Sequence, residues 1–129
     1  MSSESNVKFT ITLANPDLDA EEQERETRNL LRDIKDLDVE SAGLVEVTEI
    51  PEGGKSVGGF LVGALQAEVT ISNCYKLLAW LGDRLRNKSI ELEVEVNGKK
   101  VKVKANGQKE LTAALELAQK FIAAILNTA

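Results

Sequence analysis

The spacing of apolar residues predicts a strand and then a helix at the start of the chain. Within residues 7–13, every second residue is apolar and the residues between are Lys or Thr, the pattern of a strand with one buried face. Asp19 followed by Glu22 has the spacing of a capping box, which marks a helix start. Apolar residues then recur every three or four positions, so the pattern predicts a helix over residues 20–37.

Two further elements follow before the last third of the chain. Residues 44–50 read as a second strand, and two strands joined through one helix form a β-α-β unit, so we expect the pair to run parallel in one sheet. Residues 57–86 predict one long, largely apolar helix that begins near Gly58 or Gly59. The β-branched stretch 69–72 is the weak point of this helix, because such residues disfavour or kink a helix.

A membrane span has to be weighed for the same segment, since Glu68 is the only charged residue between Ser56 and Tyr75. In a span, this carboxylate would lie near the middle of the bilayer, where a charged side chain such as Asp costs about 2.5 to 3.5 kcal/mol. We therefore expect no membrane span.

A β-hairpin is the clearest element in the chain. The dipeptide Asn97-Gly98, the preferred two-residue type I′ turn, separates two alternating runs. The turn fixes the register, and three glutamates then face three lysines: Glu95 with Lys100, Glu93 with Lys102 and Glu91 with Lys104. Each such cross-strand pair of opposite charges contributes about 0.2 to 1 kcal/mol to the stability of the sheet.

The predicted order of elements is β-α-β-α-β-β-α, and the last element is an amphipathic helix over residues 107–126. Its apolar face comprises Leu111, Leu115, Ala118, Phe121, Ile122 and Ile125. Because at least three strands are apolar on one face only, we expect the helices to share that face and to leave the other sheet face open and polar. The predicted fold class is α/β (α+β), a two-layer sandwich with a four-stranded mixed sheet.

The widths of the two layers constrain the long central helix. Four strands about 4.8 Å apart span about 19 Å, whereas three helices about 10 Å across need about 30 Å. The central helix, apolar nearly all round, is therefore expected to be sandwiched within the protomer or buried against a second subunit or a partner. A homo-oligomer follows as an expectation.

Composition limits the size, location and chemistry of the protein. With 129 residues, 43% hydrophobic and 29% charged, we expect one globular domain with a disordered tail over residues 1–6 and a glycine-rich loop over residues 51–59. Cys74 is the only cysteine and no signal segment is apparent, so a reducing cytoplasm fits best. The sequence contains no His, which excludes Ser-His and Cys-His nucleophiles and His-ligated zinc.

The net charge of −5 is unevenly distributed. Residues 1–52 carry 14 Asp or Glu and 5 Lys or Arg, a net charge of −9, while residues 53–129 carry 7 and 11, a net charge of +4. Such an asymmetry steers charged partners, or lets the acidic end of one copy approach the basic end of another. Solvated faces of helices and strands explain the same distribution more simply.

The sequence around Gly54-Lys55-Ser56 has the order of parts of a phosphate-binding loop, with a strand before it and a helical pattern after it. In the motif G-x-x-x-x-G-K-[ST], however, Glu49 stands where the first glycine is needed, and its carboxylate would repel a phosphate. No apolar strand that ends in Asp follows to hold magnesium. We therefore expect a flexible connector, or a loop that moves or binds a partner, and no nucleotide.

Other candidate chemistry is also set aside. The many acids of residues 17–26 fit a helix start, and none is singled out as a general acid. The glutamates of the hairpin are neutralised by its lysines, so we expect no metal site, and we expect no cofactor. No aromatic residue interleaves with the basic ones and the chain is acidic, so no nucleic-acid binding is expected. Cys74 is expected to be a core residue.

Four segments carry a resemblance to a known family. They are "LDAEEQERETRNLLRDI", "VESAGLVEV", "PEGGKSVGGFLVGAL" and "LLAWLGDRLRNKSIELEVEVNGKKVKVKA". Together they resemble the effector-associated constant component proteins of cyanobacteria and actinobacteria, over about residues 17–127. The resemblance implies a non-catalytic adaptor of prokaryotic conflict systems, which works beside variable effectors such as peptidases.

The functional expectation is an adaptor that binds another protein and is not an enzyme. The residues expected to position or contact the partner lie in the glycine-rich loop and the central segment: Gly53, Gly54, Lys55, Gly58, Gly59, Leu65, Leu77 and Trp80. The alternative is a regulatory domain that senses a small molecule at a subunit interface, because two-layer α/β domains of this size bind ligands there.

Overall fold

The computed structural model describes residues 6–14, 19–46, 56–57, 60–86 and 88–127. Its elements are β1 Asn6–Leu13, α1 Ala20–Lys35, β2 Ser41–Glu46, β3 Ser56–Val57, β4 Phe60–Thr70, α2 Ile71–Arg84, β5 Ser89–Val96, β6 Lys99–Asn106 and α3 Gln108–Asn127. Of the predicted N-terminal tail, residues 1–5 lie outside the described residues, and Asn6 begins β1. The second strand begins earlier than expected, and residues 47–50 of that prediction lie outside the described part.

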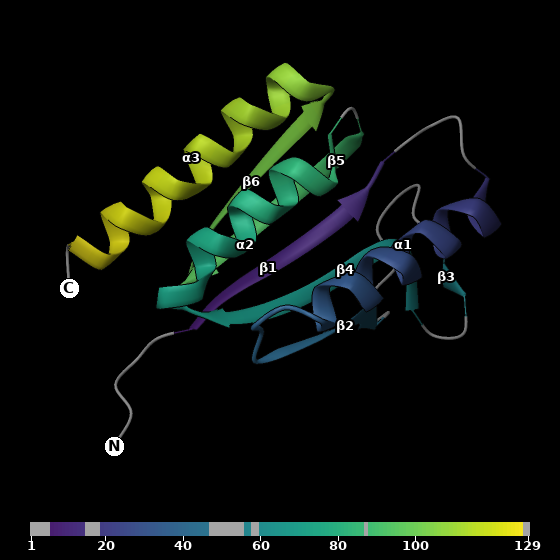
Figure 1. Ribbon diagram of the computed structural model, residues 1–129, viewed down its shortest axis with the longest axis horizontal. Helices are drawn as coiled ribbons and strands as arrows, with labels where there is room; N and C mark the ends of the chain where they lie inside the picture. The colour runs from purple at the N-terminus through teal and green to yellow at the C-terminus, as the bar shows by residue number, and fades with distance from the viewer. Residues whose placement is uncertain (1–5, 15–18, 47–55, 58–59, 87, 128–129) are drawn as a thin grey trace.

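All these strands belong to one sheet, in which every pairing is antiparallel. The order across the sheet is β2-β4-β1-β5-β6, and β3 pairs with one end of β4 (Figure 1). Both β1 and β2 are antiparallel to β4, so they run in the same direction, as expected, but β4 lies between them. This is the split β-α-β arrangement of ferredoxin-like folds, followed here by β6 and α3. The prediction of a four-stranded mixed sheet is wrong.

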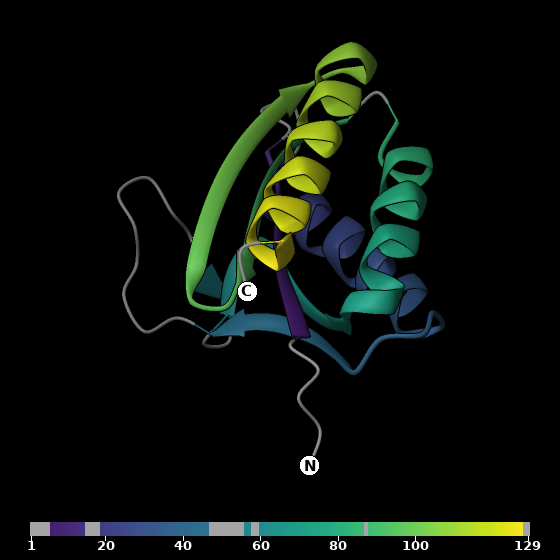
Figure 2. The ribbon, with the colours of Figure 1, turned by 90° about the vertical axis from the view of Figure 1, so that its left-hand side faces the viewer.

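The helices lie on one face of the sheet, so the molecule has two layers (Figure 2). α1 packs over β2 and β4, α3 packs over β5 and β6, and α2 lies between these two helices (Figure 1). The side chains between the layers form the core, and its largest fully buried members are Phe9, Ile11, Leu30, Ile34, Leu65, Leu78, Leu81, Leu85, Leu92, Leu111, Ile122 and Val7. The expected two-layer α+β architecture with an open sheet face is confirmed.

The first strand and helix follow the sequence pattern closely. Along β1, buried residues alternate with more exposed ones. Asp19 caps α1, because its Oδ1 accepts a hydrogen bond from the backbone N–H of Glu22 at 2.8 Å. The predicted helix ends two residues early, at Lys35.

The predicted helix over residues 57–86 is wrong in its first half, because Phe60–Thr70 is the strand β4 and the helix α2 begins only at Ile71. The reason is a two-residue period: buried Leu65, Ala67 and Val69 alternate with the polar residues 66, 68 and 70. With β4 included, five strands side by side are about 24 Å wide. The apolar segment is covered by its neighbours in the sheet, so it no longer argues for a second subunit. None of the described helices is long and apolar enough to cross a membrane.

The hairpin has the expected register, with Glu95 opposite Lys100, Glu93 opposite Lys102 and Glu91 opposite Lys104. Asn97 and Gly98 have φ angles of 53° and 81°, as a type I′ turn requires. The expected apolar face of the last helix also packs on the core: Leu111, Ala118, Ile122 and Ile125 are buried, and Leu115 and Phe121 are partly buried.

Gly63 marks a close contact between the sheet and α1. Its φ of +85° lies in the left-handed region. The side chain of Gln23, on α1, donates a hydrogen bond from Nε2 to the carbonyl of Leu13. A Cβ on Gly63 would lie 3.1 Å from that carbonyl oxygen and would collide with Gln23. The absence of a side chain at this position therefore lets α1 approach the ends of β1 and β4.

Gly63→Ala is expected to lower the free energy of unfolding by about 1 to 3 kcal/mol, because it combines an unfavourable φ with a steric overlap. Urea denaturation followed by circular dichroism measures the change. Gly43→Ala is the matched control, since a Cβ at Gly43 meets nothing within 4 Å. An equal loss of stability in both variants would contradict this account of the contact.

Candidate functional site

The register of the sheet arranges the side chains of its open face in rows across the strands. One row runs across five strands and consists of Ser41, Glu68, Lys8, Glu95 and Lys100. The next row consists of Gly43, Gln66, Thr10, Glu93 and Lys102. In the first row, carboxylates and ammonium groups alternate from strand to strand. The open face is therefore polar, and its charges of both signs are interspersed.

The half of this face formed by β5 and β6 neutralises its own charges. Lys100 lies 3.9 Å from the carboxylate of Glu95, directly opposite, and Lys102 reaches Glu91 at 3.1 Å along a diagonal. The hydrogen bond to Glu91 raises the pKa of the Lys102 ammonium. These four residues pair with one another, whereas Glu93 and Lys104 form no ion pair within 4.0 Å among the described residues.

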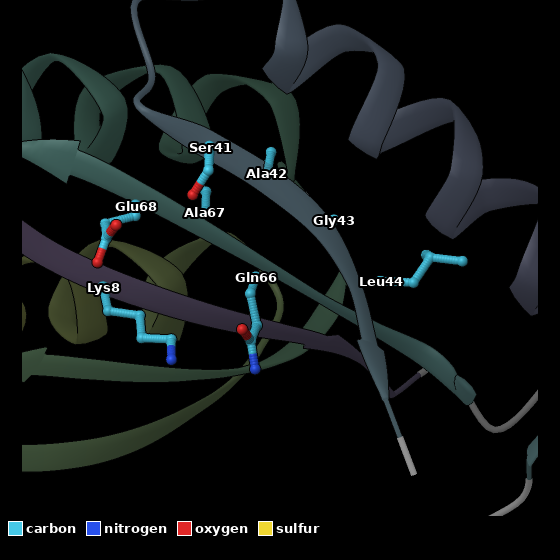
Figure 3. A pocket seen from close by; sticks show the side chains of 8 residues that line it. All are labelled: Lys8, Ser41, Ala42, Gly43, Leu44, Gln66, Ala67 and Glu68. Atoms are coloured by element: carbon cyan, nitrogen blue, oxygen red, sulfur yellow. The ribbon is translucent and has the colours of Figure 1, made fainter. Parts of the chain in front are cut away.

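The other half of the open face contains a shallow groove beside β2, with a volume of about 190 Å³. We call it the edge groove; its lining residues are Lys8, Ser41, Ala42, Gly43, Leu44, Gln66, Ala67 and Glu68. The side chains of Ser41, Gln66, Glu68 and Lys8 lie together on the open side, while Ala42 and Leu44 point toward the helices (Figure 3).

Ammonium, carboxylate, amide and hydroxyl groups from three strands therefore meet in the edge groove. Lys8 lies opposite both Glu68 and Glu95 in the sheet, yet no ion pair within 4.0 Å joins it to either carboxylate in the part of the chain that the structure describes. The edge groove therefore keeps polar groups that are available to another molecule.

The edge groove adjoins the outer edge of β2, which no described strand covers. An edge strand presents unpaired N–H and C=O groups to which another strand can add, and lysines or prolines at an edge discourage such pairing. The opposite edge, β6, carries the exposed residues Lys99, Lys100, Lys102 and Lys104. β2 has the sequence SAGLVE, with neither Lys nor Pro. Lysines thus line one sheet edge and not the other, and β2 has a register shift between Leu44 and Glu46.

Catalytic chemistry finds little support among the described residues. Cys74 is fully buried, its thiol donates a hydrogen bond to the carbonyl of Ile71 at 3.0 Å, and burial raises the pKa of the thiol. Such a thiol is a poor nucleophile, because the reactive form is the thiolate. In the described part of the chain, no three His, Cys, Asp or Glu residues are grouped so that they could hold a metal ion.

The helix side carries two hollows that involve Trp80. One, of about 180 Å³, lies between α2 and the segment after α1, and is lined by Leu37, Asp38, Val39, Asn73, Lys76, Leu77 and Trp80. The other, of about 600 Å³, lies between α2 and α3, where Gly82 allows Leu115 to pack closely. Trp80 is partly buried and also packs against the core.

The site residues predicted from the sequence do not form one surface in the described structure. Gly53, Gly54, Lys55, Gly58 and Gly59 lie outside the described residues. Leu65 on β4 and Leu77 on α2 are buried in the core. A polar substitution at either position would therefore disturb folding, and it would give no information about partner binding. Of the candidates described by the structure, only Trp80 reaches the surface.

Sequence reasoning missed the edge groove because it assigned residues 60–70 to a helix. A signal was present in the alternation of residues 64–70, which places Gln66 and Glu68 on one side of a strand and Leu65 and Ala67 on the other. The pairing of β4 with both β1 and β2, which brings Lys8 and Ser41 to these residues, has no local signal in the sequence.

Fold and site together define a two-layer α+β domain with one unprotected sheet edge beside a polar groove. Comparison with family models, curated proteins and solved structures finds no match. The resemblance to effector-associated constant component proteins therefore stays a prediction, and the function has to be argued from the geometry.

The native thiol of Cys74 is expected to resist a thiol reagent such as dithionitrobenzoate and to react stoichiometrically once urea unfolds the chain, because the buried group is inaccessible and protonated. The measurement is the absorbance of the released thiolate under native and denaturing conditions. Complete reaction of the folded protein within the mixing time would contradict the placement of Cys74 in the core.

Proposed function

We propose that the protein is a non-catalytic adaptor that captures a partner protein by adding an extended segment of that partner to the outer edge of β2. The observation that carries the proposal is the contrast between the two sheet edges. β6 is protected by four lysines, whereas β2 is uncovered among the described residues and lacks Lys and Pro. Strand addition gives affinity through main-chain hydrogen bonds and specificity through neighbouring pockets.

The edge groove supplies the specificity that strand addition needs. Successive side chains of an added strand point to opposite faces of the sheet. Every second side chain of the partner would therefore extend over the open face, beside Ser41 and Gly43, and within reach of Gln66 and Glu68 in the next strand. The adaptor role agrees with the absence of His and the burial of Cys74, and the expected place of action is the cytoplasm.

A small-molecule sensor is the second candidate, and the same groove favours it. Four kinds of polar group converge on about 190 Å³, enough for a ligand of the size of an amino acid but below the roughly 300 Å³ of common ligand pockets. Ser41→Ala/Gln66→Ala removes the hydroxyl and the amide of the groove and leaves the backbone edge intact. A metabolite that raises the melting temperature of the wild type but not of this double variant would favour the sensor.

Gly43→Lys is expected to reduce partner capture by about tenfold or more, because a lysine in the middle of an edge strand opposes strand addition. The measurement is native co-purification followed by quantitative mass spectrometry from the cells that express the protein. Gly43→Ala is the matched control and should retain the partner, because a Cβ at this position meets nothing within 4 Å. Equal recovery of the partner with folded Gly43→Lys would contradict adaptor function through β2.

A further inference from the structure

The two ends of the β2 edge are negatively charged and its middle is not. Residues 36–46 contain four acids, Asp36, Asp38, Glu40 and Glu46, and neither Lys nor Arg. All four acidic residues are exposed. Between Glu40 and Glu46, the sequence SAGLV carries no charge. A strand that pairs with this edge therefore meets carboxylates at both ends and small or apolar side chains in between.

The carboxylates of Glu40 and Glu46 are available to a partner. Neither makes a hydrogen bond or an ion pair through its side chain within the described part of the chain. The backbone N–H of Glu40 does donate to the carbonyl of Glu68 at 2.8 Å, which fixes this end of the edge next to β4. Among the described residues, the two carboxylates at the ends of the β2 edge thus have no counter-charge within ion-pair distance.

We infer that the partner segment has Lys or Arg at both ends of an uncharged, β-prone centre. The inference rests on the proposed function and adds the chemistry of the partner. Opposite charges on neighbouring strands attract, and like charges directly opposite repel. Glu40 directly precedes β2 and Glu46 ends it, with a register shift between Leu44 and Glu46. An acidic or neutral-ended segment lacks these two contacts.

A second copy of the chain is a weaker fit to the same edge. Two β2 strands paired antiparallel would bring the acids at opposite ends together, which is repulsive. The strand β6 is basic, but its lysines Lys100 and Lys102 already pair with Glu95 and Glu91. Pairing of β2 with β6 of another copy would also be a head-to-tail contact, which forms either a closed ring or an open filament. The charge pattern therefore favours an extended segment of a different protein.

The test uses the full chain and two nonapeptides of matched centre, Lys-Lys-Thr-Val-Thr-Val-Thr-Lys-Lys and Glu-Glu-Thr-Val-Thr-Val-Thr-Glu-Glu, with binding measured by fluorescence anisotropy. Each cross-strand charge pair changes the binding constant by about 1.4- to 5-fold, and two pairs change from attraction to repulsion, so the lysine peptide is expected to bind at least about fourfold more tightly than the glutamate peptide. The difference should shrink as salt is raised, because exposed charges are screened.

The double variant Glu40→Lys/Glu46→Lys is expected to reverse the preference, so that the glutamate peptide binds more tightly. Glu21→Lys/Glu116→Lys is the matched control, with the same change in net charge at exposed positions on α1 and α3. It should keep the preference of the wild type. Circular dichroism confirms that both double variants fold.

Main-chain pairing is tested with two versions of the lysine peptide that carry backbone N-methyl groups on every second residue. One version is methylated at the odd-numbered residues and the other at the even-numbered residues. Only one frame points its N–H groups at β2, so one peptide is expected to lose binding and the other to keep it.

The outcomes separate the two proposals. Equal binding of lysine and glutamate peptides, or an unchanged preference in Glu40→Lys/Glu46→Lys, would overturn the inferred chemistry and leave strand addition standing. Absence of binding for both peptides, or equal binding of both methylated peptides, would overturn strand addition and with it the proposed function. Self-association through β2 in light scattering would assign the edge to a second copy and overturn the inference.

Discussion

The pairing of β4 with β1 on one side and β2 on the other is the interaction on which the rest of the structure depends. It places an apolar segment with one charge in the interior of the sheet, where neighbours cover its backbone groups. It also sets the register that puts Leu65, Ala67 and Val69 into the core and Gln66 and Glu68 on the open face. A shift of one residue would exchange these two sets, so the register is strongly specified by burial.

The same pairing determines where the sheet ends. With β4 between β1 and β2, β2 becomes an edge, and the hairpin places the lysine-rich β6 at the opposite edge. One edge is thus protected by positive charge, and the other is framed by negative charge. This difference makes β2 the place where a partner strand fits.

Local patterns predicted the elements that local interactions determine. The alternation of β1, the Asp19 cap of α1, the Asn97-Gly98 turn and the apolar face of α3 all appear as expected, because each depends on residues close in the sequence. The helix predicted over residues 60–70 is a strand, because the mostly small and apolar run 57–65 does not by itself distinguish a strand from a buried helix, and the alternation that marks a strand is clear only over residues 64–70.

The candidate site could not be predicted for a related reason. Lys8, Ser41 and Glu68 come from three strands that are distant in the sequence, and no local signal specifies that β4 inserts between β1 and β2. The predicted contact residues Leu65 and Leu77 belong, in the prediction, to one long apolar helix buried within the protomer or against a second subunit or a partner, whereas in the structure both are core residues.

Amide hydrogen exchange by nuclear magnetic resonance tests the central claim most directly, because it reports each backbone N–H of β2 and β4 separately. In the free protein, the amides of β4 should be protected throughout residues 64–70, while those of residues 41–46 should alternate between protected and rapidly exchanging. Addition of the lysine-ended nonapeptide should protect the rapidly exchanging set. Uniform protection of residues 41–46 in the free protein, or no change on addition of the peptide, would contradict the account of β2 as an open edge that accepts a partner strand.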